Sequence, residues 1–296
     1  MGRDLYEKFP AARKVFDEAD AALDAPISQL CFDGPEDQLK LTENTQPAIL
    51  TVSFAAAVLL HERGIDAHYT AGHSLGEYSA HAVAGTFSFA DAVCTVRNRG
   101  RYMQQAVPSG QGAMAAILGL PAQTITAACT EAAAETGSVV APANFNAPEQ
   151  TVISGSVAGV ERAAALCKER GAKRAVMLPV SAPFHCSLMQ PAQDSLATDL
   201  SKVDFYPPQI PVVCNVDAAV VATGDAARYT LTRQVTGAVR WVECMQLLIA
   251  EGVTHFVEVG PGKVLCGLMR QIDRSQICLN VEDSASLEKT LELLKS

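Results

Sequence analysis

Apolar and polar residues in the N-terminal part of the chain alternate at the helical period. Pro10 suits the first turn of a helix, and Val15 and Phe16 lie on its apolar side. Residues 47–62 predict a second, largely buried helix, and residues 67–71 predict a short strand. The chain therefore begins with helices and reaches its first strand just before a glycine-rich turn.

The period of the pattern changes at about residue 110. The segments that follow are strand 113–120, helix 122–135, strand 139–146, strand 150–154, helix 158–169 and strand 173–180. This β-α-β-β-α-β order is that of the ferredoxin-like split βαβ arrangement. We therefore predict a small ferredoxin-like subdomain at residues 110–180, inserted into a larger body made of residues 1–109 and 181–296.

Strands and helices alternate again after this subdomain. The strands are predicted at residues 212–216, 256–259 and 277–280, with helical segments between them. Such alternation is typical of an α/β body whose sheet is parallel and covered by helices.

Composition narrows the functions to consider. With 296 residues, 49% of them hydrophobic, the chain can bury a substantial core. No apolar run is long enough to cross a membrane and no signal-peptide pattern precedes the first helix, so we expect a cytoplasmic protein. The net charge of −9 offers no general attraction to nucleic acid or to a membrane surface. The nine cysteines lack paired spacing, which predicts free thiols, and no cluster has metal-ligand spacing.

The segment Gly72-His73-Ser74-Leu75-Gly76 carries the first candidate chemistry. It matches the G-x-S-x-G nucleophile elbow and stands between a predicted strand and a predicted helix, as that motif requires. The glycines allow a tight turn and close approach of neighbouring backbone, and the N–H of Leu75 is a candidate oxyanion donor. The alternative is a glycine-rich turn with an incidental serine.

A serine needs a base to act as a nucleophile at neutral pH. His185 follows a predicted strand end, and His255 begins a late strand, where α/β-hydrolases carry their base. The residues alone leave these two equal. The remaining histidines are His61 and His68, predicted to face solvent, His81 within a helix, and His73, whose side chain should point away from its neighbour Ser74.

Five blocks of sequence extend the motif: GHSLGEYSA at 72–80, RNRGRYMQ at 97–104, NFN at 144–146, FHC at 184–186 and EVGPGKVL at 258–265. In this order, over nearly the whole chain, they resemble the malonyl-CoA:acyl carrier protein transacylases of fatty-acid synthesis. The resemblance implies an α/β hydrolase-like large domain with an elbow serine and an inserted ferredoxin-like subdomain.

The resemblance also implies roles for individual residues. Ser74 would form the acyl-enzyme, and His185 would be its general base, oriented by a main-chain carbonyl in the segment 238–241 instead of an Asp. Arg99 would bind the free carboxylate of the malonyl group, which a guanidinium can meet with two parallel hydrogen bonds. The residues alone favour a surface position for Arg99, between Arg97 and Arg101.

Three further positions have two interpretations each. Phe184 resembles the position where related acyltransferases carry Phe for malonyl donors and a smaller residue for branched ones, although it also suits a core. Asn144 and Asn146 would bind the pantetheine arm of the substrate or cap a turn around Phe145. Residues 260–262 resemble a phosphate loop but lack its full spacing, so a plain turn is the better interpretation.

The implied reaction has malonyl-CoA and an acyl carrier protein as partners and proceeds by a ping-pong mechanism. No bound cofactor is expected, because coenzyme A and the carrier's phosphopantetheine are substrates. The rival enzyme class is a serine esterase or thioesterase in which His255 pairs with Asp217, and the rival without catalysis is an inactive homologue that binds the carrier. An acidic carrier should dock on basic side chains, for which the candidates are Lys173, Arg174, Arg233 and Lys263.

The resemblance also concerns the start of the sequence. Members of the family carry a strand and a loop of the form F-P-G-Q-G-S-Q before the segment that corresponds to residues 1–5, and the first Gln of that loop is their second oxyanion donor besides the residue at Leu75. We therefore expect a start assigned too far downstream or a trimmed chain, and a version extended upstream to be more active and more stable.

Overall fold

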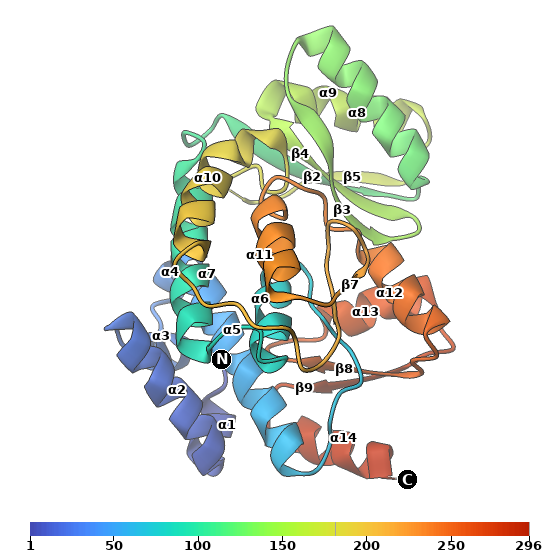
Figure 1. The fold of residues 1–296 in the computed structure, drawn as a ribbon. Helices are drawn as coiled ribbons and strands as arrows, with labels where there is room; N and C mark the ends of the chain where they lie inside the picture. Colours follow the sequence, from blue (N-terminus) through green and yellow to red (C-terminus); the bar gives the residue numbers. More distant parts are fainter. Residues whose placement is uncertain (181, 296) are drawn as a thin grey trace.

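Two long helices, α5 (Thr42–Glu62) and α7 (Phe89–Gln105), run through the larger part of the computed structural model, which describes residues 1–180 and 182–295 (Figure 1). Helix α5 is apolar on nearly every side, so it is buried by the elements around it, as predicted for residues 47–62. The helices that precede it are α1 (Arg3–Lys8), α2 (Pro10–Leu23), α3 (Ile27–Asp33) and α4 (Glu36–Leu39). Helix α2 begins at the predicted proline.

The strands of this body are short and form two separate sheets. Strand β1 (Thr70–Ala71) pairs in parallel with β6 (Val212–Val213), and β6 pairs antiparallel with β7 (Val220–Val221). The second sheet holds β8 (His255–Val259) and β9 (Ile277–Val281), which are parallel. The single parallel sheet predicted for the body is thus present only in part among the described residues.

The strands predicted at residues 67–71 and 212–216 are both shorter in the structure, and the second is shortened by a turn. The segment 212–216 leaves the sheet after Val213, because Cys214 N–H donates to Ala219 O and closes a tight turn into β7. This turn buries Asn215 completely. The side chain of Asn215 accepts a hydrogen bond from the main chain of Ser74. Helices surround the strands: α6 (Leu75–Val83), α10 (Gln190–Leu200), α11 (Gly224–Arg233), α12 (Trp241–Ala250), α13 (Val264–Ile272) and α14 (Ser284–Lys295), with a 3-10 turn η1 (Ser187–Met189).

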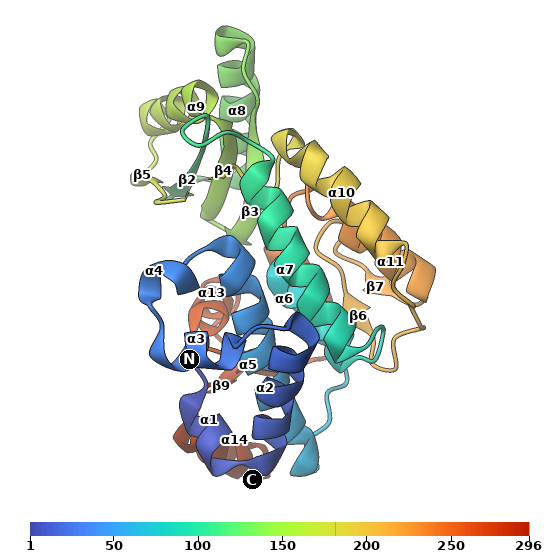
Figure 2. The ribbon, with the colours of Figure 1, turned by 90° about the vertical axis from the view of Figure 1, so that its left-hand side faces the viewer.

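The middle of the chain forms a part of its own above the body in Figures 1 and 2. Its elements are β2 (Gly112–Leu118), α8 (Ala122–Thr136), β3 (Val140–Ala147), β4 (Gln150–Ser156), α9 (Val157–Glu169) and β5 (Arg174–Met177). The strands form an antiparallel sheet in the order β3-β4-β2-β5, and α8 packs beside α9 on the sheet. Each element lies close to its predicted range. The predicted boundary at residue 181 lies outside the described residues.

Strand β3 joins this middle part to the body. At its outer edge, Val239 N–H donates to Ala143 O at 2.8 Å, and Phe145 N–H donates to Val239 O at 2.9 Å. A β-bridge between Asn144 and Val239 completes the contact. The edge of the sheet is therefore covered by the body, and the segment around Val239 is held by main-chain hydrogen bonds.

The nine cysteines are free, as predicted, and most are buried. Among residues 1–180 and 182–295, no helix combines the length and the apolarity needed to cross a membrane. Within the same residues, no group of His, Cys, Asp and Glu side chains is arranged to hold a metal ion.

Candidate active site

Ser74 stands in the turn between β1 and α6, as the elbow motif predicts. Its φ of 53° and ψ of −107° lie outside the regions that most residues adopt. Gly72 is buried, and a Cβ at this position would lie 1.9 Å from the carbonyl of Gly76. Only glycine allows the two sides of this turn to approach so closely. Gly76 itself has open space around the position of a Cβ, so only one of the two motif glycines is required by packing.

The two glycines give a matched pair of variants. Gly72→Ala is expected to lower the melting temperature by several degrees and to remove the activity, because the new methyl group collides with backbone that cannot move away. Gly76→Ala is expected to keep the native melting temperature and the native activity, since it replaces a glycine by a residue of higher helix propensity where there is open space. Thermal unfolding and acyl-enzyme formation measure the difference. Equal behaviour of the two variants would contradict the role assigned to Gly72.

His185 is the histidine that reaches the serine. Its Nε2 lies 2.7 Å from Ser74 Oγ, although 111 positions separate the two residues in the sequence. His185 also has a positive φ, of 60°. Four non-glycine residues of the described chain have a positive φ, and two of them are this pair. Backbone strain of this kind concentrates at functional sites.

Two main-chain carbonyls orient the imidazole of His185. Nδ1 donates to Gln234 O at 2.9 Å and lies 3.1 Å from Gly237 O. The expected segment 238–241 is therefore wrong by a few residues, because the chain turns towards the histidine just after α11 and before Val239 enters its bridge with β3. Since both carbonyls can only accept, Nδ1 carries the proton and Nε2 is free to accept one from the serine.

Burial lowers the pKa of His185 to about 3, and the nearby positive charge of Arg99 acts in the same direction. The imidazole is therefore neutral at neutral pH and can accept a proton. A protonated imidazole at this position is costly until a negative charge develops beside it. The structure thus contains a serine, a neutral base and a fixed tautomer, and within residues 1–180 and 182–295 no carboxylate is hydrogen-bonded to the histidine.

Arg99 is almost completely buried, at 2% exposure, in contrast to the surface position that the residues alone favour. Its Nη1 donates to Gln46 Oε1 at 2.7 Å, and its Nη2 donates to Gln234 Oε1 at 2.9 Å and to Ser74 Oγ at 3.0 Å. All three acceptors are neutral. Burial lowers the pKa of Arg99, so the site holds a cation for which an anionic substrate group would be a favourable partner.

Four supporting residues were not identified from the sequence: Gln46, Glu77, Asn215 and Gln234. Each is buried and polar, and each hydrogen-bonds to Ser74, Arg99 or another of the four. Their signal in the sequence is weak. Asn215 interrupts an apolar segment, which indicates a buried polar group but no function, and Gln46 directly precedes an apolar segment.

The two asparagines of β3 are placed at the boundary with the body. Asn146 Oδ1 accepts a hydrogen bond from His73 Nε2 at 2.8 Å, and the ring of His73 packs against Trp241. The side chain of His73 therefore points away from Ser74 Oγ and towards the middle part of the chain. Asn144 is buried beside its bridge to Val239. A role for either asparagine in substrate binding stays a prediction.

Phe184 is half-buried and packs against both the core of the body and a small apolar cluster of the middle part, formed by Met114, Ala143 and Val152. It lies next to His185 in the chain, so bulk at this position borders the base. Its proposed effect on donor choice stays a prediction.

The residues of the rival triad do not meet the serine. His255 is exposed and its Nδ1 contacts Thr254 Oγ1. Asp217 is exposed and accepts two hydrogen bonds from Arg233, at 2.9 and 3.0 Å. The imidazole at Ser74 Oγ belongs to His185.

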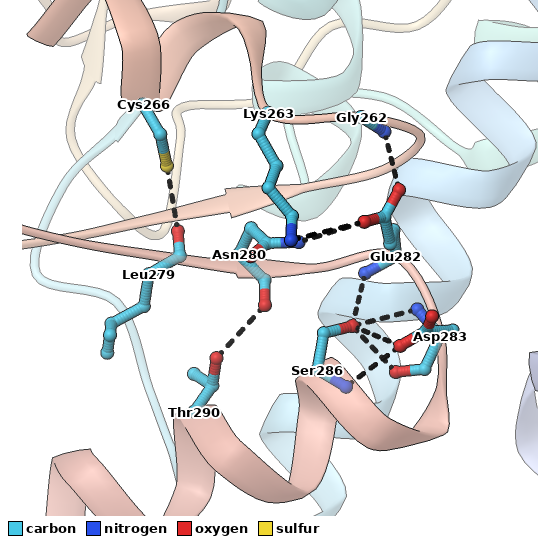
Figure 3. Close-up of polar contacts among 9 residues, drawn as sticks. All are labelled: Gly262, Lys263, Cys266, Leu279, Asn280, Glu282, Asp283, Ser286 and Thr290. Carbon is cyan, nitrogen blue, oxygen red and sulfur yellow. Dashed lines mark hydrogen bonds and ion pairs between the residues drawn. The ribbon is translucent and has the colours of Figure 1, made fainter.

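The glycine loop at residues 260–262 is a turn whose polar groups are occupied. Gly262 N–H donates to the carboxylate of Glu282 at 3.0 Å, and Lys263 lies 3.7 Å from the same side chain (Figure 3). Two N–H groups in the first turn of α13, those of Leu265 and Cys266, donate to the carboxylate of Glu258. These carboxylates fill the positions that a phosphate would take, in agreement with the turn interpretation.

Comparison with known proteins shows the family to which this chain belongs. Residues 1–288 match the acyl transferase domain family. The chain is 48% identical over 295 residues to the malonyl CoA-acyl carrier protein transacylase of Bacillus subtilis, covering 100% of this chain and 93% of the relative. It is 47% identical over 294 residues to the protein of the same name from Escherichia coli K12, covering 99% and 94%.

Solved structures agree with these relatives. An acyl-carrier-protein S-malonyltransferase from Burkholderia pseudomallei superposes with a TM-score of 0.94 at 49% identity, covering 97% of this chain and 93% of the other. A malonyl-transacylase solved in complex with its type II PKS acyl-carrier protein gives a TM-score of 0.95 at 44% identity, covering 99% and 94%. This chain therefore belongs to the acyl transferase domain family and, within it, to the malonyl CoA-acyl carrier protein transacylases.

Proposed function

We propose that this protein transfers a malonyl group from malonyl-CoA to the phosphopantetheine thiol of an acyl carrier protein, through a malonyl ester on Ser74. The observation that carries the proposal is the meeting of His185 Nε2 and Arg99 Nη2 at one oxygen, Ser74 Oγ, at 2.7 and 3.0 Å. A neutral base and a buried cation at the same nucleophile suit a thioester donor that carries a free carboxylate. The names of the relatives support the same donor and acceptor.

In the first half-reaction, Ser74 Oγ attacks the thioester carbonyl while its proton passes to His185 Nε2. The carbon–sulfur bond breaks, and His185 returns the proton to the departing coenzyme A sulfur. The carbonyls of Gln234 and Gly237 stabilise the imidazolium that exists between these events. In the second half-reaction, the carrier thiol gives its proton to His185 and attacks the ester carbonyl. The ester carbon–oxygen bond breaks, and His185 returns the proton to Ser74 Oγ, which restores the free serine.

Two further groups complete the proposal. Arg99 exchanges its contact with Ser74 Oγ for the malonyl carboxylate, which provides the negative partner that its neutral acceptors do not supply. The N–H of Leu75, at the start of α6, donates to the oxyanion of the tetrahedral intermediate. No bound cofactor enters these steps, because both thiols are substrates.

The finer description of the fold also belongs to this proposal. We assign residues 1–109 and 181–296 to a hydrolase-like large domain and residues 110–180 to a ferredoxin-like subdomain. The order of elements and of strands in the middle part supports the assignment. The cytoplasmic location expected from the sequence stays a prediction.

Mass spectrometry of the intact protein tests the function directly. Incubation with malonyl-CoA, acetyl-CoA and methylmalonyl-CoA together should leave a malonyl adduct on Ser74, and addition of acyl carrier protein should move it to the carrier. Release of free malonate at the full rate without a carrier would identify a hydrolase. Absence of any adduct would identify an inactive homologue.

Docking of an acidic carrier should depend on ionic strength. Three of the candidate basic residues already form exposed ion pairs, Lys173 with Glu149, Arg233 with Asp217, and Lys263 with Glu282. Such pairs are worth only about 0–1 kcal/mol, so these side chains remain available to a partner. Arg233 directly precedes Gln234, which places it beside the site.

Raising salt is therefore expected to slow transfer from malonyl-Ser74 to the carrier more than it slows adduct formation from malonyl-CoA. Stopped-flow or quenched measurements of each half-reaction supply the comparison. Arg233→Ala should weaken only the carrier step, while Arg162→Ala on α9, which removes a surface pair with Glu135, should change neither. The same salt dependence for both half-reactions would contradict electrostatic docking.

A further inference from the structure

Glu77 is a buried carboxyl group that the proposed mechanism does not use. It lies in the first turn of α6, three residues after Ser74, and none of its surface is exposed. Burial raises its pKa to about 7, and hydrogen bonds from Gln234 and from the main chain of Asn215 act in the opposite direction. Such a group costs free energy of folding that an apolar residue would not, which points to a role other than stability.

One carboxyl oxygen of Glu77 accepts hydrogen bonds from two segments that lie far apart in the sequence. Its Oε2 accepts from Asn215 N–H at 3.0 Å and from Gln234 Nε2 at 2.7 Å. Asn215 comes from the turn after β6, and Gln234 comes from the end of α11, 138 and 157 positions away in the sequence. The carboxyl group is thus the point at which both segments meet the serine helix.

Asn215 transmits this contact to both sides of the nucleophile. Its Oδ1 accepts from Ser74 N–H at 2.8 Å, and its Nδ2 donates to Gly72 O at 2.8 Å. The Asn215 side chain therefore hydrogen-bonds to the main chain on both sides of the strained turn at Ser74, and Glu77 fixes the position of Asn215 through its main-chain N–H.

Gln234 transmits the contact to the other two groups of the site. Its Nε2 donates to Glu77 and also to Ser74 O at 2.9 Å, so its Oε1 faces Arg99 Nη2 at 2.9 Å. Its main-chain oxygen accepts from His185 Nδ1. Glu77 Oε2 already accepts two hydrogen bonds, so a proton on this carboxyl group would be carried by the other oxygen, and Oε2 stays an acceptor in either state. Together with Ser74 O, it fixes Nε2 of Gln234 on its own side, so that Oε1 points to the arginine. With the amide reversed, an NH₂ group would face a guanidinium that can only donate.

We propose that Glu77 is a positioning residue whose carboxyl oxygen sets the orientation of the Gln234 amide and the place of Asn215, and so holds Ser74, His185 and Arg99 in one geometry. The inference deepens the proposed function and rests on it. Glu77 acts through these two neighbours and touches no reacting atom.

Glu77→Gln tests this role with little change in shape. In either orientation its amide leaves an NH₂ group without an acceptor, facing the donors Asn215 N–H and Gln234 Nε2 or buried at the position of Oε1, for which the described residues supply no hydrogen-bond partner. We therefore expect misplacement of the site and a loss of about 10²-fold in the rate of adduct formation. Acetyl and malonyl donors should both slow, and the preference for malonyl should fall as Arg99 loses its fixed acceptor. The readouts are kcat and KM for each donor, together with the melting temperature.

His81→Gln is the matched control for stability. His81 is equally buried on the same helix, but its Nδ1 contacts Thr86 Oγ1, and among the described residues it has no hydrogen bond to Ser74, His185, Arg99 or their supporting residues. This variant should lose stability and keep the donor preference and kcat. If it loses activity in parallel with Glu77→Gln for the same fall in melting temperature, Glu77 has only a structural role and the proposal fails.

A double-mutant cycle with Gln234→Leu tests the path of the effect. That change removes the side-chain contacts of Gln234 and leaves its main-chain carbonyl available to His185. Adding Glu77→Gln to it should slow the reaction less than in the native background, whereas additive losses would overturn the proposal. If Glu77→Gln does not fold, Gln234→Leu alone tests the same link, and a native rate and native donor preference in that variant would overturn it.

The native protein is measured in each of these assays. A native protein that forms no malonyl adduct would contradict the proposed function itself. If the native protein forms the adduct and Glu77→Gln forms it at a rate within about twofold of the native rate, only the role of Glu77 is contradicted.

Discussion

Ser74→Ala is expected to form no acyl adduct with malonyl-CoA, because the variant lacks the oxygen on which the ester forms. His185→Ala is expected to slow adduct formation by about 10²–10⁴-fold, since both half-reactions pass a proton through this imidazole. Intact-protein mass spectrometry measures the first effect, and quenched-flow kinetics with malonyl-CoA measures the second.

Matched variants separate this pair from similar residues nearby. Ser79→Ala removes a buried hydroxyl of α6, and His255→Ala removes the exposed histidine of β8. Both should retain nearly native rates. If His255→Ala were inactive while His185→Ala was nearly normal, the assignment of the base would be wrong and the hydrolase hypothesis would gain support.

Arg99→Ala is expected to lower the preference for malonyl over acetyl donors by about 10–100-fold, the value of a hydrogen bond to a charged group. The guanidinium is buried, and its hydrogen bonds within the described part of the chain go to neutral acceptors, so a donor with a carboxylate supplies a directly bonded negative partner. A donor without that group leaves the cation unpaired. Adduct formation with each donor, offered separately and in competition, measures the change.

Arg97→Ala is the control for this prediction. Arg97 lies two positions before Arg99 on the same helix α7. Its guanidinium donates to the main-chain oxygen of Leu23 and not to a residue of the site. Its removal should leave donor preference unchanged. Equal losses for both donors in Arg99→Ala would show that this residue supports the structure or coenzyme A and does not recognise the malonyl carboxylate.

Local patterns in the sequence were sufficient for most of the elements and for the nucleophile. Helix α8 was expected at residues 122–135 and is observed at Ala122–Thr136, because its period and its preceding proline act within one segment. The turn at Ser74 follows from a glycine whose neighbours lie only four residues away. The acyl transferase family was also identified correctly, from short motifs in their order along the chain.

The tertiary structure decided the features that depend on residues far apart in the sequence. Periodicity places His185 and His255 alike after or at a strand, and only folding brings the first of them to Ser74, 111 positions away. Arg99 became a buried cation because α5 and the end of α11 close over it with Gln46 and Gln234. The hydrogen bonds of Glu77 likewise span more than a hundred positions. No local propensity encodes these contacts, since each side chain is polar by itself and acquires its role only from partners that other segments supply.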